Sequence, residues 1–262
     1  MKVENVRASG IAKRYEFRSH DGEQVNASYV NRPEKHIICL STQVGCLGGC
    51  LFCSTGTTKP FVRNLSCNEM IEMARQIQTS ERLLHEPLLI SFMGSGEPLD
   101  NVDNVVRAIK RFPVFARFAV SVSGRNISRV AELPSYVKVQ FTLISPFEEE
   151  RKAMQPSVDS LECLKVAAMG YSGAKELNVP LIKGFNDGRE DVSSIVLLSH
   201  ELGDIPIKLN KFHSIGMFES SVRAMLCLEE FREQGVKAEY YETDGESILA
   251  ACGQLDLCAD EE

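Results

Sequence analysis

The sequence lacks every pattern that would place it in or across a membrane. None of its apolar runs approaches the roughly 18 residues needed to span a bilayer. The N-terminal MKVENVRASG has no apolar stretch typical of a secretory signal. Internal repeats, low-complexity tracts and long linkers are also missing. We therefore expect a cytoplasmic globular protein with no membrane partner, and 262 residues are enough for one large core.

Positive charge is scarce. The formal net charge is -7, and the last 37 residues hold eleven acids against only Arg232 and Lys237. An acidic total removes the usual argument for a nucleic-acid partner without excluding one. Eight dispersed cations near the expected mouth of the site are the candidates for phosphate contacts: Arg7, Lys13, Arg14, Arg18, Arg32, Lys35, Lys59 and Arg63.

Cysteine is plentiful instead, and the nine cysteines are an odd number, which argues against a disulfide framework. Three of them fall within STQVGCLGGCLFCSTG, which starts at Ser41, with the spacing Cys-x3-Cys-x2-Cys. Thiolates are the ligands that zinc and iron–sulfur clusters prefer. A structural zinc site needs a fourth ligand nearby, and none stands at zinc-like spacing. The motif therefore predicts a [4Fe–4S] cluster on Cys46, Cys50 and Cys53, with one iron left open. Four further cysteines are expected to be small buried apolar residues: Cys67, Cys163, Cys227 and Cys258.

Strand-like and helical patterns alternate along most of the chain. The strand-like runs are 36–40, 88–93, 118–122, 137–143, 176–182, 207–212 and 238–241. The helical patterns are 66–84, which starts with a capping box at Ser66 and Glu69, and 102–112, 161–169, 192–202 and 222–234. This alternation predicts an α/β fold with a parallel sheet, an open or partial barrel, and functional groups at the carboxyl ends of its strands. We expect the barrel over residues 36–262. An N-terminal β-hairpin extension is expected over residues 1–35, with strands 11–17 and 24–30.

With these motifs in place, the sequence resembles the radical S-adenosylmethionine (SAM) superfamily and, within it, the RlmN/Cfr family of adenine methyltransferases of RNA. Six segments occur in the family's order: CLSTQVGC, FMGSGEPL, VSVSG, NDG at 186–188, LN at 209–210 and AACGQL at 250–255. The resemblance covers about residues 8–258. It implies the superfamily's partial (β/α)6-type barrel, and rRNA or tRNA as the substrate.

The resemblance also implies how the cofactors are held. The open iron would bind the amino and carboxylate groups of SAM, and the GEP motif would hold the SAM ammonium group through a charge-assisted contact. The implied SAM contacts are Gly96, Glu97, Ser121, Thr142 and Asn210. Thr142 and Ile144 stand where the family usually has Ser and His. An electron donor such as flavodoxin or ferredoxin would reduce the cluster.

Two further thiols match cysteines that the family uses covalently. By that resemblance, Cys252 is first methylated by SAM, and a 5′-deoxyadenosyl radical then removes a hydrogen from its S-methyl group. The carbon radical adds to the adenine ring, and Cys39 resolves the thioether by forming a disulfide bond with Cys252. Gly253 would let the loop move the thiol between SAM and substrate.

The chain departs from the family's pattern at positions that concern the substrate. The family's N-terminal accessory domain and basic C-terminal tail have no counterpart in this sequence, and Asn26 stands where the family has a glutamate proposed as proton acceptor. An amide cannot take a proton at neutral pH. Two alternatives therefore stay open: the same chemistry on a small nucleoside, nucleotide or natural product, or a cluster-bearing sensor without turnover.

Overall fold

The computed structural model describes residues 1–83, 86–112, 116–242 and 244–257. Most of its strands form one ten-stranded sheet in the order β1-β2-β3-β4-β7-β8-β9-β10-β11-β12. Their bounds are β1 Lys2–Ser9, β2 Ala12–Arg18, β3 Gln24–Arg32, β4 Lys35–Leu40, β7 Leu88–Phe92, β8 Ala116–Val122, β9 Lys138–Thr142, β10 Lys175–Leu181, β11 Ile207–Lys211 and β12 Ala238–Tyr241. A separate two-stranded pair joins β5 (Gln43–Val44) to β6 (Arg63–Asn64).

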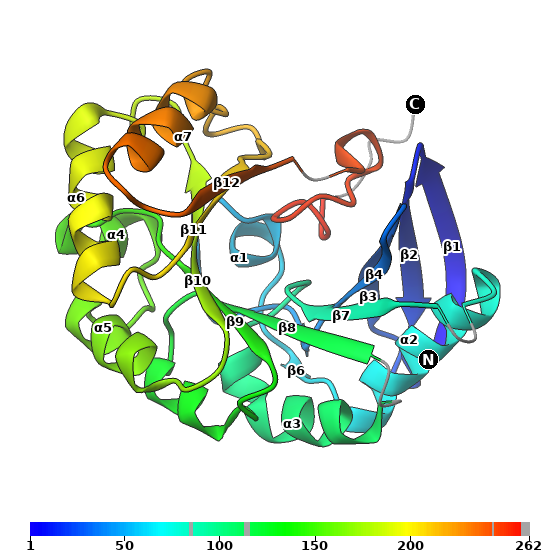
Figure 1. The fold of residues 1–262 in the computed structure, drawn as a ribbon. Coiled ribbons are helices and arrows are strands. Elements are labelled where there is room, and N and C mark those ends of the chain that lie inside the picture. The colour runs from blue at the N-terminus through cyan, green and yellow to red at the C-terminus, as the bar shows by residue number, and fades with distance from the viewer. Residues whose placement is uncertain (84–85, 113–115, 243, 258–262) are drawn as a thin grey trace.

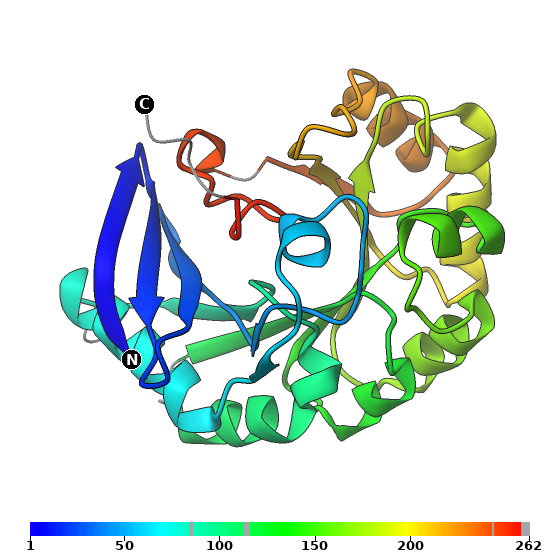
Figure 2. The same cartoon turned by 180° about the vertical axis from the view of Figure 1, so that it is seen from behind.

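Within the ten-stranded sheet, the strands from β4 to β12 run parallel and follow the order of the chain. The sheet curves around a central space, and its longer helices lie on the outer side (Figures 1 and 2). The C-terminal segment returns across the open side toward the N-terminal strands (Figure 1). The predicted α/β partial barrel is therefore confirmed, and each strand-like run of the sequence corresponds to one parallel strand.

The N-terminal extension is an antiparallel meander, β1-β2-β3, that continues into β4. The predicted hairpin corresponds to β2 and β3, but β1 was not expected. Its sequence KVENVRAS is mostly exposed and carries charges at an edge of the sheet, so it lacks the apolar alternation that marks a strand. Whether residues 1–35 form a unit separate from 36–262 stays a prediction.

The helices follow the predicted patterns closely. They are α1 Ser54–Thr58, α2 Cys67–Ser80, α3 Val102–Arg111, α4 Glu148–Met154, α5 Leu161–Gly170, α6 Arg189–Glu201 and α7 Ala224–Glu233, with short 3-10 turns η1 Pro98–Asn101, η2 Ile127–Glu132 and η3 Glu246–Ile248. The capping box at Ser66 and Glu69 is formed as predicted. Only α1 and α4 were missed, because five and seven residues are too short to show a periodic apolar face. Among the described residues, no helix is both long and apolar enough to cross a membrane.

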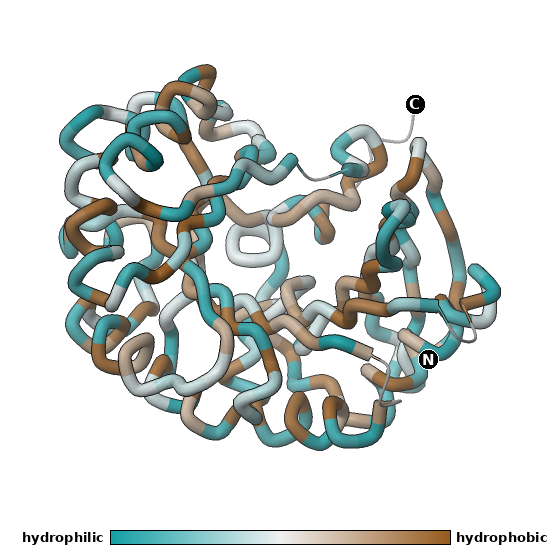
Figure 3. The backbone as a smooth tube through the Cα atoms, in the orientation of Figure 1, coloured by the Kyte–Doolittle hydropathy of each residue, from teal (hydrophilic) through white to brown (hydrophobic). Residues whose placement is uncertain are grey.

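The parallel strands divide their side chains between two environments. One face packs against the helices with fully buried apolar residues such as Ile38, Ile90 and Phe141, and apolar stretches follow the central strands in Figure 3. The other face lines a cavity with polar groups such as Ser121 and Asn178. A barrel interior of this kind is suited to hold a ligand rather than to form a packed apolar core.

Candidate active site

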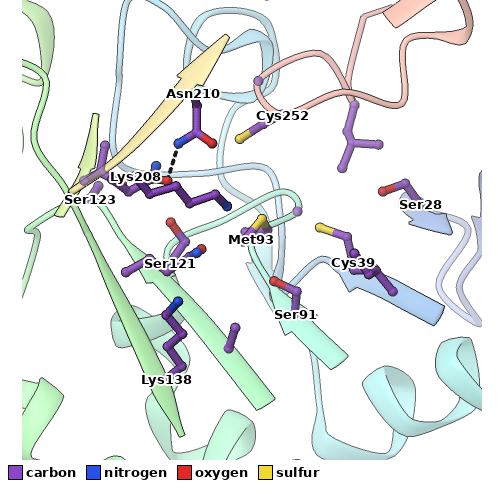
Figure 4. Close-up of a pocket in the computed structure, with 18 of the residues that line it drawn as sticks. Ser28, Cys39, Ser91, Met93, Ser121, Ser123, Lys138, Lys208, Asn210 and Cys252 are labelled. Atoms are coloured by element: carbon purple, nitrogen blue, oxygen red, sulfur yellow. Dashed lines mark hydrogen bonds between the residues drawn. The ribbon is translucent and has the colours of Figure 1, made fainter. Parts of the chain in front are cut away.

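A cavity of about 990 Å³ occupies the inside of the curved sheet. The ten predicted site residues all lie on its wall: Cys39, Cys46, Cys50, Cys53, Gly96, Glu97, Ser121, Thr142, Asn210 and Cys252. They come from seven different segments of the chain, and Figure 4 shows the side chains of Cys39, Ser121, Asn210 and Cys252 around the same space. The prediction that functional groups gather at the carboxyl ends of the strands agrees with this placement.

The three cysteines of the Cys-x3-Cys-x2-Cys motif lie on the loop between β5 and α1. Gly48 lies between two of them, and its amide N–H donates to the Sγ of Cys46 at 3.3 Å. The Nε2 of Gln155 lies 3.9 Å from the Sγ of Cys50. Burial raises the pKa of Cys46 to about 12, and it raises the pKa of Cys50 and Cys53 as well. A raised pKa means that the thiolate form is unfavourable in the free protein. Ligation to a metal centre would stabilise this form, because coordinated thiols are deprotonated.

The spacing of these thiols suits a cluster better than a single ion. Among the described residues, no group of three His, Cys, Asp or Glu side chains is placed to hold one metal ion. A four-iron cluster is larger, since each cysteine binds a different iron. Three thiols on one loop that line the same cavity therefore fit a [4Fe–4S] cluster with one iron open toward that cavity.

The cluster loop depends on a glycine at position 45. Gly45 has a φ of +72°, and a Cβ at this position would lie 1.9 Å from the carbonyl oxygen of Pro60. Neither the backbone conformation nor the space allows a side chain. Gly45 thus lets the loop that carries Cys46 fold back against the segment that follows α1.

Glu97 is buried at the end of the loop after β7, and hydrogen bonds define the position of its carboxylate. The Oε2 atom accepts from the backbone N–H and the hydroxyl of Ser123 at 2.8 and 2.5 Å, and Oε1 accepts from the N–H of Leu99 at 3.1 Å. Burial raises the pKa of Glu97 to about 7, although these hydrogen bonds oppose the rise. A bound ammonium group would stabilise the ionised form, so the site suits the role predicted for Glu97.

Three of the other predicted SAM contacts lie on strands of the parallel sheet, and the fourth, Gly96, lies in the loop after β7. Ser121 is on β8, Thr142 ends β9 and Asn210 is on β11. The Asn210 side chain donates a hydrogen bond to Asn178 of β10 (Figure 4). Gly96 has a φ of +98°, and a Cβ there would lie 2.6 Å from the Cβ of Gln43. These groups offer donors and acceptors along one wall, as a zwitterionic and nucleoside-bearing ligand requires.

The two remaining thiols lie on different segments, one strand and one loop. Cys39 is on β4, between Ser28 of β3 and Ser91 of β7. Cys252 lies on the C-terminal loop and is exposed toward the cavity. Burial raises the pKa of Cys39 to about 12, and that of Cys252 to about 11, where the charge of Lys208 acts in the opposite direction. Both are protonated thiols at neutral pH, so each must lose its proton before it can act as a nucleophile.

One sequence-based expectation about cysteine needs correction. All eight described cysteines are free, so the structure does not support the disulfide bond that was expected between Cys39 and Cys252 as an intermediate. Cys67 and Cys227 are buried as expected, but Cys163 is exposed, because it lies in the first turn of α5 beside the N-cap Ser160. Cys258 lies outside the described residues.

Two side chains of the site were missed, and Asn26 has a different role from the one considered. Ser123 holds Glu97, and Lys208 projects into the cavity near Cys252 (Figure 4). The alternation along β8 and β11 could have pointed to both, since each lies two residues from a predicted SAM contact. Asn26 is buried and donates to the carbonyl oxygen of Leu255 at 2.6 Å and to Asp256 at 3.1 Å.

Comparison with known proteins agrees with this arrangement. No family model matches the chain. A relative from Petrotoga mobilis, described as a probable dual-specificity RNA methyltransferase RlmN, is 30% identical over 97% of this chain and 77% of its own length. A relative from Parabacteroides distasonis with the same description is 28% identical over 92% of this chain and 74% of its own length.

The fold is similar to that of a solved protein with the same chemistry. A radical SAM methyltransferase from Sphaerobacter thermophilus superposes with a TM-score of 0.86 at 25% identity, over 97% of this chain and 80% of that protein. A structure of TYW1 with a lysine-pyruvate adduct superposes with a TM-score of 0.59 at 14% identity, which supports the fold alone. From this sequence identity, this superposition and the cysteine-lined cavity, we conclude that the chain is a radical SAM methyltransferase and belongs to the RlmN family.

Proposed function

We propose that the protein methylates a ring carbon of adenine in RNA, and that the methyl carbon passes through Cys252. The observation that carries the proposal is the presence of Cys39 and Cys252 on the wall of the same cavity as the cluster cysteines. A methyltransferase that passes the methyl group directly from SAM to its substrate has no use for two further thiols. An electrophilic ring carbon cannot accept an electrophilic methyl group directly, and a relay thiol provides a route that avoids this mismatch.

Each thiol has a defined task in this scheme. Cys46, Cys50 and Cys53 would hold the cluster, which together with SAM supplies a 5′-deoxyadenosyl radical. The Cys252 thiolate would accept a methyl group from SAM by displacement, and the radical would then remove a hydrogen atom from that S-methyl group. The carbon would bond to the adenine ring, while the ring hydrogen leaves as a proton and one electron passes to an external carrier. The Cys39 thiolate would attack the sulfur of Cys252, so that a transient disulfide forms, the carbon–sulfur bond breaks and the released carbon takes up a proton; an external reductant would return the disulfide to two thiols. An electron donor such as flavodoxin or ferredoxin would be needed.

The cavity wall offers charges that suit a polyanionic substrate. Six cations line it, against the three carboxylates Glu97, Glu176 and Glu239: Lys35, Lys110, Arg117, Lys138, Lys208 and Lys211. Among the described residues, no ion pair engages four of these cations, namely Lys35, Lys110, Arg117 and Lys208. Phosphate contacts by Lys and Arg provide most of the affinity for nucleic acid.

The cations first considered for RNA binding are mostly neutralised. Seven of the eight form ion pairs with acidic side chains: Arg7, Lys13, Arg14, Arg18, Arg32, Lys59 and Arg63. Lys35 alone belongs both to these eight cations and to the six cations that line the cavity. This pairing favours the second candidate, methylation of a small nucleotide, because such a substrate would need only the cations inside the cavity.

The test is methyl transfer from SAM with a labelled methyl group, in cluster-loaded and reduced protein. Total RNA and a pool of free adenine nucleotides are offered together, and the nucleosides are analysed by mass spectrometry. The RNA proposal predicts a methylated adenine released only from RNA. Label in the free nucleotides alone would replace it with the small-molecule candidate, and no label in either would favour a sensor.

A further inference from the structure

A buried carboxylate, Asp256, makes several of the hydrogen bonds that attach the Cys252 loop to the rest of the molecule, besides those of Arg14 to the carbonyls of Leu249 and Leu257 and of Gln254 to Ser214. The Asp256 side chain is only 2% exposed. The Oδ2 atom accepts from the hydroxyls of Thr55 at 2.6 Å and Ser95 at 2.5 Å. The Oδ1 atom accepts from Asn26 and Lys59, both at 3.1 Å. A buried carboxylate is tolerated only with such partners, and here every contact reaches a segment distant in sequence.

These contacts join the Cys252 loop to three parts of the site. Thr55 belongs to α1, directly after Cys53, and Ser95 lies in the loop that leads to Glu97. Asn26 belongs to β3, in the N-terminal meander. The backbone adds two further bonds in the same place, from the N–H of Asp256 to Ser54 Oγ at 3.2 Å and from the N–H of Ser54 to the carbonyl of Gly253 at 2.7 Å.

Asn26 is matched to this carboxylate. Its amide donates to Asp256 and, at 2.6 Å, to the carbonyl oxygen of Leu255. A glutamate at position 26 would have no donor for either acceptor at neutral pH and would place a second carboxylate beside Asp256. The amide at position 26 and the acid at position 256 therefore belong together, and the side chain of residue 26 is engaged in holding the loop.

The segment before Cys252 is also fixed. The N–H of Ala250 donates to the carbonyl of Gly245 at 2.9 Å, and Ala251 is fully buried. Only Cys252 is therefore free to change its backbone conformation, because Ala251 on one side is buried and the carbonyl of Gly253 on the other side accepts from Ser54. This differs from the expectation of a loop that moves as a whole about Gly253.

We propose that Asp256, with Asn26 as its amide partner, is a positioning residue that fixes the Cys252 thiol within the cavity beside the cluster loop. The proposal rests on the proposed role of Cys252 as methyl carrier. It assigns to Asp256 no contact with SAM or substrate, since Asp256 is not among the residues that line the cavity and its carboxylate is occupied by protein donors.

The test compares four variants in the full chain: Asp256→Asn, Asn26→Asp, the double exchange of both, and Glu201→Gln. The last is a control, because Glu201 forms a surface ion pair with Lys165 on the outer face of the barrel. Three quantities are measured. The first is the content of iron and sulfide per chain, and the second is the fraction of Cys252 that is methylated after incubation with SAM. The third is the mobility of residues 249–257 in cluster-free protein, followed by hydrogen exchange of the segment and by iodoacetamide labelling of its Cys252.

The proposal predicts that both single variants keep iron and sulfide but lose methylation of Cys252, by a factor on the order of 10 to 100. Exchange and labelling of residues 249–257 should rise, while the peptide with Cys39 is unchanged. The double exchange again pairs one amide with one carboxylate but leaves the carbonyl oxygen of Leu255 without its donor, so it should recover only part of the methylation that each single variant loses.

Three results would overturn it. Unchanged exchange and labelling of residues 249–257 in both single variants would show that the carboxylate does not hold the loop. Loss of iron together with methylation would make Asp256 a support of the cluster loop. No recovery in the double exchange would break the pairing with Asn26. A parent protein whose Cys252 is never methylated would refute the proposed function, while the cluster-free exchange data would still decide whether the loop is held.

Discussion

At the scale of single residues, the site combines groups whose protonation opposes the roles proposed for them. Glu97, Cys39 and Cys252 all have a raised pKa because removal from bulk water penalises their charged forms. The ligand can supply the missing stabilisation for Glu97, since an ammonium group favours the carboxylate. For Cys252, the nearby charge of Lys208 favours the thiolate. Ionisation of Glu97 is thereby coupled to the binding of an ammonium group in the cavity.

Glu97 predicts a specific pH dependence of SAM binding. Its pKa is about 7 in the free protein, and the ionised form is the one that attracts an ammonium group. Affinity for SAM should therefore rise with pH up to about 7 and level off above it. At pH 6 it should be weaker by up to about tenfold, one pH unit below the pKa. Equilibrium dialysis of cluster-loaded protein between pH 5.5 and 8.5 measures this. Glu97→Gln should bind weakly at every pH, and the same slope in that variant would assign the titration to another group.

At the scale of elements, the cluster loop requires a backbone path that only glycine allows. Gly45→Ala would place a methyl group 1.9 Å from the carbonyl oxygen of Pro60, at a φ of +72°. Gly235 is a matched control, because it has a φ of +80° with nothing within 4 Å of an added Cβ. Gly235→Ala should cost about 1 kcal/mol of unfolding free energy. Gly45→Ala should cost more and should also lose the cluster. Thermal unfolding and iron content give both results, and equal behaviour of the two variants would contradict the role of Gly45.

The parallel strands of the barrel were predictable from the sequence because each is a short buried run between helical patterns. β1 was not, because an exposed edge strand with charges has no such pattern. Local motifs likewise predicted the cluster cysteines and the capping box at Ser66. The contacts of Asp256 could not be predicted, since its partners Asn26, Thr55 and Ser95 lie far away along the chain and only the tertiary fold brings them together.

At the scale of the whole molecule, the net charge of -7 conceals a cavity wall with more cations than carboxylates. If RNA enters there, Lys35→Gln with Arg117→Gln should weaken RNA binding and reduce the slope of log affinity against log salt. Two lost phosphate contacts on a single strand correspond to a change of about 1.4. Lys13→Gln with Arg18→Gln is the control, because these cations pair with Glu81 and Glu4. Binding isotherms over a range of salt concentrations measure both, and equal slopes for the two double variants would exclude the cavity cations as phosphate contacts.

The central claim is that the methyl carbon is transferred through Cys252 and released by Cys39. The most direct measurement is digestion and mass spectrometry of the Cys39→Ala variant after reaction with SAM and total RNA. Without the second thiolate, the carbon–sulfur bond to the product has no route to break. A Cys252 peptide carrying one carbon and an adenine nucleotide is the predicted result. Methylated RNA released at the parent rate by the variant, with an unmodified Cys252 peptide, would contradict the account.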